Sequence, residues 1–288
     1  MITHPFAYEA PTTIDDAVKA LGRSREAKVL AGGHSLIPLM KLGLAEPELI
    51  VDIGRIAGLR EIKSENGAVT VGALATHRSI TDNSTITKAL AALAEAAAAV
   101  GDLQVRSRGT IGGSLAHADP AADEPAPTLA FDATIGVIGP KGRRDIPARE
   151  FFKETFETAL ATNEIVVEIR FPAPAGRTGS AYAKFPHPAS GFAIVGVAAV
   201  VGLKADGTVE RASIGVTGAA AGPFRANAAE RALVGTRGDA SAIAAAAAKA
   251  ADGMTLLSDL TASSEFRKQL LIVHTRRALE RAVERARG

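Results

Sequence analysis

The chain of 288 residues is 47% hydrophobic and carries a net charge of only +2, from 33 basic and 31 acidic residues. This length allows one large domain or two to three smaller ones, while the balanced charge and the 4% of aromatic residues argue against a nucleic-acid-binding protein. The absence of cysteine excludes disulfides and cysteine-ligated zinc or iron–sulfur centres within this chain, and it fits a cytosolic protein.

The first part, residues 1–55, alternates helix and strand signals. Thr13 to Asp16 resembles a capping box, with Asp where Glu or Gln is usual, and predicts a helix through Leu21. Strands are expected at 28–30 and 48–53. Between them lies a first glycine turn, and Ser35 at its end is expected to cap the next helix. The residues of this first turn are Ala31, Gly32, Gly33, His34 and Ser35.

The second part, residues 56–175, mixes strands with a helix. An alanine-rich stretch at 85–100 predicts one helix, because alanine has the highest helix propensity. A second glycine turn follows the helix and consists of Thr110, Ile111, Gly112, Gly113 and Ser114. Alternating polar and apolar residues predict strands at 69–73 and 164–171 and a hairpin formed by 133–138 and 144–146.

The third part, residues 178–288, follows a proline-rich break at 172–176. Strand signals come first, at 181–185, 193–201 and 211–217, and helix signals follow, at 226–234, 241–251 and 265–286. Strands followed by helices indicate an α+β arrangement. The apolar run at 192–203 is shorter than the about 20 residues that span a bilayer, and the N-terminus resembles no signal peptide. We therefore expect no transmembrane segment.

The two glycine turns carry the main functional signal. A glycine backbone can approach a phosphate closely, and successive free N–H groups in such a turn form a small anion-binding hollow. Two such turns in one chain favour a ligand with two phosphates, such as a dinucleotide. Neither turn continues as a P-loop or as the nicotinamide-binding G-x-G-x-x-G pattern. An ordinary strand-to-helix loop is the competing interpretation for either turn taken alone.

Several polar residues near these turns have two interpretations. His34 is expected to contact a ligand without performing acid–base chemistry, since no partner base is evident. The cluster of His117, Asp119, Asp123 and Glu124 matches no strong metal motif, so its carboxylates are better suited to a ribose or ring group. Lys184 either reaches a ligand or is an exposed lysine that guards an edge strand.

The arginines of the last helix also have two interpretations. They are interleaved with Glu280 and Glu284, which favours pairing within the helix on a solvated face, and contact with a partner subunit is the alternative. The basic residues are Arg276, Arg277, Arg281, Arg285 and Arg287.

The two turns also carry a resemblance to a known family. Leu30 to Leu36 followed by Val51-Asp52-Ile53, and Arg108 to Leu115 followed by Asp119-Pro120 and Asp123, resemble the two flavin-binding stretches of the molybdenum hydroxylases. Along nearly its whole length the chain is similar to the medium, FAD-binding subunit of enzymes of the carbon monoxide dehydrogenase type, within the xanthine oxidase family. The resemblance implies an α+β fold with two FAD-binding subdomains and a C-terminal domain that packs helices on an antiparallel sheet.

The resemblance further implies that both turns wrap the pyrophosphate of FAD and the adjoining flavin. It places Asp123 and Lys184 at the cofactor and Ile111 near the isoalloxazine ring. One departure stands out: Gly191 and Phe192 occupy positions where carbon monoxide dehydrogenases have Asp and Tyr. Because of this departure, the resemblance determines neither the substrate nor how oxidants reach the flavin.

Partner subunits are implied by the resemblance as well. A small subunit would carry 2Fe-2S clusters and a large subunit the molybdenum cofactor, in a cytoplasmic dimer of heterotrimers that can associate with the inner face of the membrane. This chain would then relay electrons from the clusters through FAD to an acceptor. A stand-alone flavin oxidoreductase and a non-catalytic nucleotide-binding scaffold are the alternatives. The substrate stays open between carbon monoxide, an aldehyde and an N-heterocycle.

Overall fold

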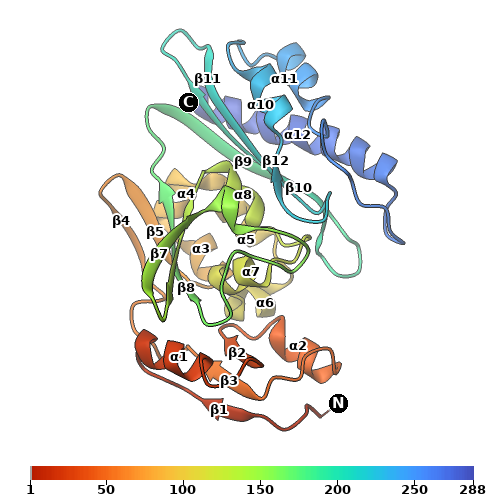
Figure 1. The fold of residues 1–288 in the computed structure, drawn as a ribbon. Coiled ribbons are helices and arrows are strands. Elements are labelled where there is room, and N and C mark those ends of the chain that lie inside the picture. The colour runs from red at the N-terminus through yellow and green to blue at the C-terminus, as the bar shows by residue number, and fades with distance from the viewer. Residues whose placement is uncertain (1) are drawn as a thin grey trace.

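In a computed structural model, which describes residues 2–288, the chain forms three sheets stacked from one end of the molecule to the other (Figure 1). The N-terminal part lies at one end, a larger central part follows, and the C-terminal part lies at the opposite end. Helices and antiparallel sheets are mixed in the central and C-terminal parts, which confirms the α+β class. Within the described residues, no helix combines the length and apolar character needed to cross a membrane.

The N-terminal part is built on a small parallel sheet with the strand order β1-β3-β2. The helix after Thr13 begins as predicted, because the Thr13 hydroxyl accepts a hydrogen bond from the backbone N–H of Asp16. Ser35 does stand at the N-cap of the next helix, but its side chain makes no capping hydrogen bond, so that prediction was wrong. The elements are β1 (Ala7–Glu9), α1 (Ile14–Leu21), β2 (Ala27–Leu30), α2 (Leu36–Lys41) and β3 (Leu49–Asp52).

The central part is a five-stranded antiparallel sheet with the order β4-β5-β8-β6-β7, covered by short helices. Its core contains the fully buried Leu90, Leu93, Ile111 and Phe171. The elements are β4 (Ile62–Glu65), β5 (Ala68–Gly72), α3 (His77–Asp82), α4 (Ser84–Ala89), α5 (Ala91–Ala98), α6 (Leu103–Arg108), α7 (Ile111–His117), α8 (Pro125–Ala130), β6 (Thr134–Gly139), β7 (Gly142–Pro147), α9 (Ala148–Phe151) and β8 (Ile165–Pro172).

The prediction of one helix over residues 85–100 was wrong, because the helix breaks at Leu90, whose φ of −127° and ψ of 51° are not helical. After the break, the backbone N–H of Ala92 donates to the hydroxyl of Ser180, a residue of the C-terminal part. A side chain distant in the sequence therefore caps α5, and local composition gives no sign of it.

The C-terminal part is a four-stranded antiparallel sheet with the order β12-β11-β10-β9. The long helix α12 lies across β9 and β10, while α5 and α8 of the central part contact the same sheet (Figure 1). Every residue of β10 is buried, as its apolar run predicts for a covered strand. The elements are β9 (Arg177–Pro186), β10 (Ala193–Leu203), β11 (Val209–Thr217), β12 (Phe224–Arg225), α10 (Asn227–Leu233), α11 (Ala240–Ala247) and α12 (Ser264–Arg287).

The arginines of α12 do more than pair within their helix. Arg276 does lie near Glu280, at 3.8 Å. Arg281 and Arg285 instead reach Glu95 of α5, whose carboxylate also accepts the backbone N–H of Tyr182 at 2.8 Å. The expectation of a merely solvated basic face was therefore wrong for these two arginines, which tie the C-terminal part to the central part.

Candidate functional site

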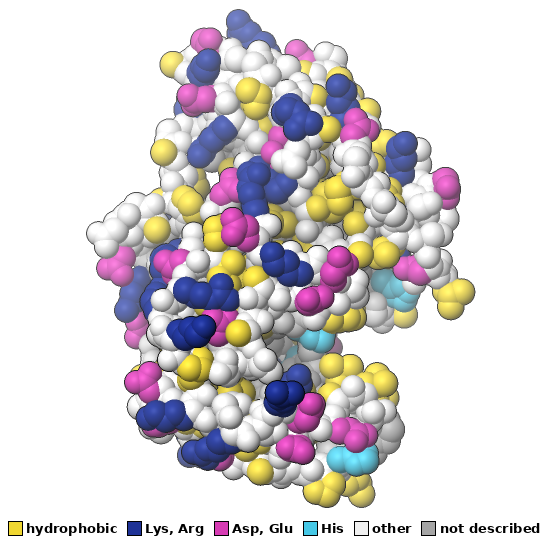
Figure 2. All heavy atoms as spheres, in the orientation of Figure 1, with side chains coloured by type: hydrophobic (Ala, Val, Ile, Leu, Met, Phe, Trp, Pro, Cys, Tyr) yellow, Lys and Arg dark blue, Asp and Glu magenta, His cyan; other side chains and the backbone are white. Residues whose placement is uncertain are grey.

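The two glycine turns are in direct contact where the N-terminal part meets the central part. A Cβ atom placed on Gly32 would lie 2.2 Å from the carbonyl oxygen of Arg108, which lies two residues before the start of the second turn. A Cβ atom on Gly113 would lie 3.9 Å from the Cβ atom of Ala31. Only glycine fits at position 32, and the fold brings together the two segments that the sequence singled out. On one face, a hollow separates the N-terminal part from the rest of the molecule (Figure 2).

The first turn offers free hydrogen-bond donors. Within the described residues, the backbone N–H groups of residues 32–35 have no protein acceptor. Gly33 has a φ of +78°, a conformation that favours glycine. The exposed ring of His34 is held by its own turn, with Nδ1 at 3.1 Å from the carbonyl oxygen of Gly32. Successive unpartnered N–H groups of this kind are suited to bind an anion.

The second turn differs, because its own fold uses its N–H groups. Ile111 and Gly112 donate to the carbonyl oxygens of Ala75 and Ala73, and Gly113 donates to the hydroxyl of Thr110. The backbone of Ser114 donates to the carbonyl oxygen of Thr110. Our expectation of free N–H groups was therefore wrong for this turn. At Gly113 the second turn exposes backbone without a side chain, and the side chain of Ile111 is fully buried in the core.

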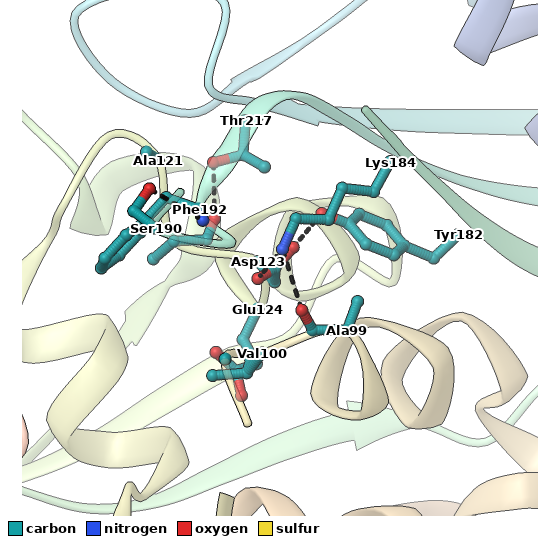
Figure 3. Close-up of polar contacts among 12 residues, drawn as sticks. Ala99, Val100, Ala121, Asp123, Glu124, Tyr182, Lys184, Ser190, Phe192 and Thr217 are labelled. Carbon is teal, nitrogen blue, oxygen red and sulfur yellow. Dashed lines mark hydrogen bonds and ion pairs between the residues drawn. The ribbon is translucent and has the colours of Figure 1, made fainter. Parts of the chain in front are cut away.

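Asp123 and Lys184, which the sequence analysis treated separately, form a buried ion pair of 2.8 Å (Figure 3). The other oxygen of Asp123 accepts the Tyr182 hydroxyl at 2.6 Å, and Lys184 also donates to the carbonyl oxygen of Ala99. The Lys184 side chain is only 7% exposed, so the interpretation as an exposed edge-strand lysine was wrong. Burial raises the pKa of Asp123 to about 6, although Lys184 and Tyr182 both act to lower it.

The neighbouring Glu124 forms a second buried network. One of its oxygens contacts Nδ1 of His77, and the other accepts the Ser114 hydroxyl at 2.8 Å. Burial disfavours both charges, yet their mutual attraction wins: the pKa of His77 lies above its usual value and the pKa of Glu124 below it. Neither His77 nor Tyr182 was predicted from the sequence. The sequence did contain one sign that such partners exist. Asp123 and Glu124 are adjacent acids in an otherwise apolar stretch, and acids that become buried there need partners.

The other two members of the predicted polar cluster point elsewhere. The His117 ring packs on Phe156 with ring centroids 5.0 Å apart, and burial lowers the pKa of His117. Asp119 accepts the backbone N–H of Ala121. Across residues 2–288, no three His, Asp or Glu side chains are grouped as a metal site requires.

The loop that carries the departure at Gly191 and Phe192 joins β9 to β10. Gly191 has a φ of +71°, which favours glycine over the Asp of the resembled enzymes. Phe192 is 48% exposed, and the next residue, Ala193, donates its backbone N–H to Ala121. This loop therefore borders the segment that leads to Asp123 (Figure 3).

The residues present fit a dinucleotide at the junction of the two turns. The first turn supplies unpartnered N–H groups. The second turn supplies a backbone surface that a ligand can approach closely, because position 113 has no side chain. Of the two compensated buried carboxylates, Glu124 holds the hydroxyl of Ser114 at the end of this turn, and Asp123 is its neighbour in the sequence. Such a site can hold phosphates and orient a planar group, but it contains no exposed acid–base pair for substrate chemistry.

Comparison with known proteins agrees with this geometry. Residues 4–174 match the family described as FAD binding domain in molybdopterin dehydrogenase, and residues 180–282 match the CO dehydrogenase flavoprotein C-terminal domain. The chain is 40% identical to the carbon monoxide dehydrogenase medium chain of Hydrogenophaga pseudoflava, over 98% of both chains. It is 36% identical to the 6-hydroxypseudooxynicotine dehydrogenase complex subunit alpha of Paenarthrobacter nicotinovorans, over 98% of this chain and 96% of that one. A crystal structure of Cu,Mo-CO dehydrogenase matches with a TM-score of 0.95 and 36% identity, over 99% of this chain and 100% of that one.

Proposed function

Because this chain belongs to the family of FAD-binding medium subunits of molybdenum hydroxylases, we propose that it relays electrons from 2Fe-2S clusters of a partner subunit through FAD to an external acceptor. The chain is an oxidoreductase subunit, and its own cofactor is FAD. With no cysteine it has no thiolate ligands for an iron–sulfur cluster, so the clusters belong to another subunit.

The main support for the proposed FAD site is the direct contact between the two glycine turns. The free N–H groups of the first turn, from Gly32 to Ser35, bind the pyrophosphate of FAD. The second turn, from Thr110 to Ser114, lies against the cofactor at Gly113 and Ser114, and its Ile111 supports it from behind. Ala31 and His34 complete the rim of the first turn, with His34 in a binding role.

When bound, FAD supplies the redox chemistry, and the residues of this chain position it and exclude competing reactions. Lys184 and Asp123 serve at the flavin end of the site, where their fixed charges act on the ring. Tyr182 and the carbonyl oxygen of Ala99 hold these two side chains in place. No side chain of this chain needs to abstract a proton or hydride from substrate.

The substrate is selected in the large subunit of the complex. Two relatives support this view: they are 40% and 36% identical to this chain, yet one is named for carbon monoxide and the other for 6-hydroxypseudooxynicotine. Carbon monoxide, an aldehyde and an N-heterocycle are therefore all compatible with this flavin subunit.

The assembly we propose is a dimer of heterotrimers with a small iron–sulfur subunit and a large molybdenum subunit. Relatives named as medium chains, or as subunits of a complex, support a multi-subunit enzyme. Within the chain we propose two FAD-binding subdomains, at 1–55 and 56–175, and a C-terminal domain at 178–288. The three separate sheets support this division.

Substitution at Gly113 tests the site. In Gly113→Asp, a carboxylate faces the pyrophosphate, and like charges about 4 Å apart near a protein surface repel by roughly 4 kcal/mol. We expect Gly113→Asp to bind FAD at least about tenfold more weakly than the neutral isostere Gly113→Asn, with both variants folded by circular dichroism. FAD titration followed by flavin fluorescence measures this difference. Equal affinity of the two folded variants would remove the pyrophosphate from this position.

A further inference from the structure

A buried ion pair lies beneath the second glycine turn, and the proposed binding site makes no direct use of it. His77, the first residue of α3, and Glu124, which directly precedes α8, are 4% and 1% exposed. At this burial neither side chain offers a surface to a ligand that lies in the hollow between the parts. The route from the pair to a ligand that the structure shows directly is through the residues that the pair contacts.

Those contacts reach both ends of the turn. At its start, the backbone N–H of His77 donates to the carbonyl oxygen of Gly109 at 3.1 Å, and a Cβ atom on Gly109 would lie 2.6 Å from the Nε2 atom of His77. At its end, Glu124 accepts the Ser114 hydroxyl. The His77 ring thus packs directly against the backbone before Thr110, while its ionic partner holds the last residue of the turn.

We propose that His77 and Glu124 form a positioning pair that fixes the second glycine turn in the conformation that binds FAD. The inference rests on the proposed function. A buried ion pair is weak support for stability, since apolar residues of similar volume often stabilise a core equally well. A pair that spans both ends of one turn instead fixes where that turn lies.

The charged groups near His77 and Glu124 have partners of their own. The main effect of the pair is therefore to hold the turn in place. Asp123, adjacent to Glu124 in the sequence, is paired with Lys184. Arg106 is engaged by the carbonyl oxygens of Val100 and Gly101. Because each of these neighbours has its own partner, His77 is the one group that loses its ionic partner when Glu124 is replaced by a neutral residue. The substitution therefore acts on the hold of Glu124 on Ser114 and His77 and leaves the other ion pairs intact.

The test compares FAD affinity in Glu124→Gln, His77→Asn and a matched control. The control is Glu230→Gln: Glu230 is also buried, pairs with Arg225 at 2.5 Å and accepts the backbone N–H of Ile214, but it lies in the C-terminal part. The full chain is titrated with FAD at a temperature where circular dichroism shows every variant folded, and melting temperatures are measured without FAD. We expect Glu124→Gln to weaken FAD binding at least about tenfold and Glu230→Gln to change it less than about twofold.

His77→Asn provides the second measurement if Glu124→Gln does not fold. Asparagine keeps a donor near the position of Nδ1 but loses the charge, so we expect FAD binding weaker than that of the wild type and stronger than that of His77→Leu. Wild-type affinity in the folded Glu124 or His77 variants would overturn the positioning role and leave the proposed function intact. Equal losses in Glu124→Gln and Glu230→Gln would also overturn it, because the effect would then follow stability. A wild-type chain that binds no FAD would contradict the proposed function itself.

Discussion

Lys184 shows how a single residue can look exposed in the sequence and be buried in the fold. Its strand, β9, is an edge of its sheet, where lysine usually points to solvent. The central part covers this edge, and Lys184 is enclosed with Asp123, Tyr182 and the carbonyl oxygen of Ala99. The positive charge of Lys184 therefore compensates the carboxylate of Asp123, whose charged form burial disfavours.

Removal of Lys184 should extend the pH range over which the free energy of unfolding depends on the ionisation of Asp123. The folded pKa of Asp123, at about 6, already exceeds its unfolded value, so the folded state holds this proton more tightly and stability falls as pH rises from about 4 to 6. Lys184→Met raises the folded pKa further and extends this fall to higher pH. We expect a loss of about 3–5 kcal/mol at pH 8 and a smaller loss at pH 5, where the carboxyl group is protonated.

Urea unfolding of Lys184→Met and the wild type at both pH values measures these losses. The double variant Lys184→Met with Asp123→Asn is the control, because it has no carboxyl group left to titrate at this position. Its own free energy of unfolding should lack the fall between pH 5 and pH 8 that Asp123 causes in the wild type and in Lys184→Met. An equal loss in the single variant at both values would show that Asp123 does not depend on Lys184 for its charge.

At the residue level, the glycine turns were predictable and the buried pairs were not. A Gly-Gly step is visible in the sequence because glycine is required wherever two backbones touch, as at Gly32. The partnership of Glu124 with His77 exists only after α3 and the segment before α8 have been brought together. The same holds for the free N–H groups: the sequence cannot show that the second turn satisfies its own donors.

Among the elements, the contact between α12 and α5 determines how the C-terminal part is attached. Glu95 accepts hydrogen bonds from Arg285 and Arg281 and from the backbone of Tyr182. The same strand that contains Tyr182 supplies Ser180, which caps α5, and Lys184. The attachment of β9 to α5 therefore fixes the strand that positions Lys184 at Asp123.

Glu95→Gln should weaken this attachment. The substitution removes the charge that pairs with two arginines, and Gln has a single carbonyl oxygen for the donors that two carboxylate oxygens now accept. We expect a loss of about 1–3 kcal/mol in the free energy of unfolding. The control Glu280→Gln removes an exposed pair within α12 and should cost less than about 0.5 kcal/mol. Similar losses in the two variants, measured by urea unfolding, would contradict a connecting role for Glu95.

Long periodic elements were predictable from the sequence, whereas short ones at the site were not. The alternation in β8, the apolar run of β10 and the pattern of α12 each persist long enough to be recognised. Helices α6, α7 and α8 have six or seven residues each and contain glycine or proline or follow a polar loop, so their pattern is weak. The second turn lies in α7, and Glu124 directly precedes α8. The weak patterns of these helices explain why the contacts of Glu124 could not be predicted from the sequence.

For the whole molecule, the arrangement of three sheets places the two turns at one junction. The parallel sheet presents the first turn, the central part presents the second, and the C-terminal part supplies Lys184, which pairs with Asp123 of the central part. All three parts therefore contribute to one candidate site. This arrangement suits the proposed role, in which this chain positions FAD and the substrate chemistry takes place in a partner subunit.

Binding of FAD by this chain is tested by the visible absorption spectrum of the purified full-length protein, recorded after incubation with FAD and removal of free cofactor. We expect the protein to retain flavin bands that correspond to about one FAD per chain, with FAD identified after release by heat. We expect these bands to be lost in Gly113→Asp. A folded wild-type chain that retains no flavin, both alone and when co-expressed with its partner subunits, would contradict the claim and favour a nucleotide-binding scaffold without a redox role.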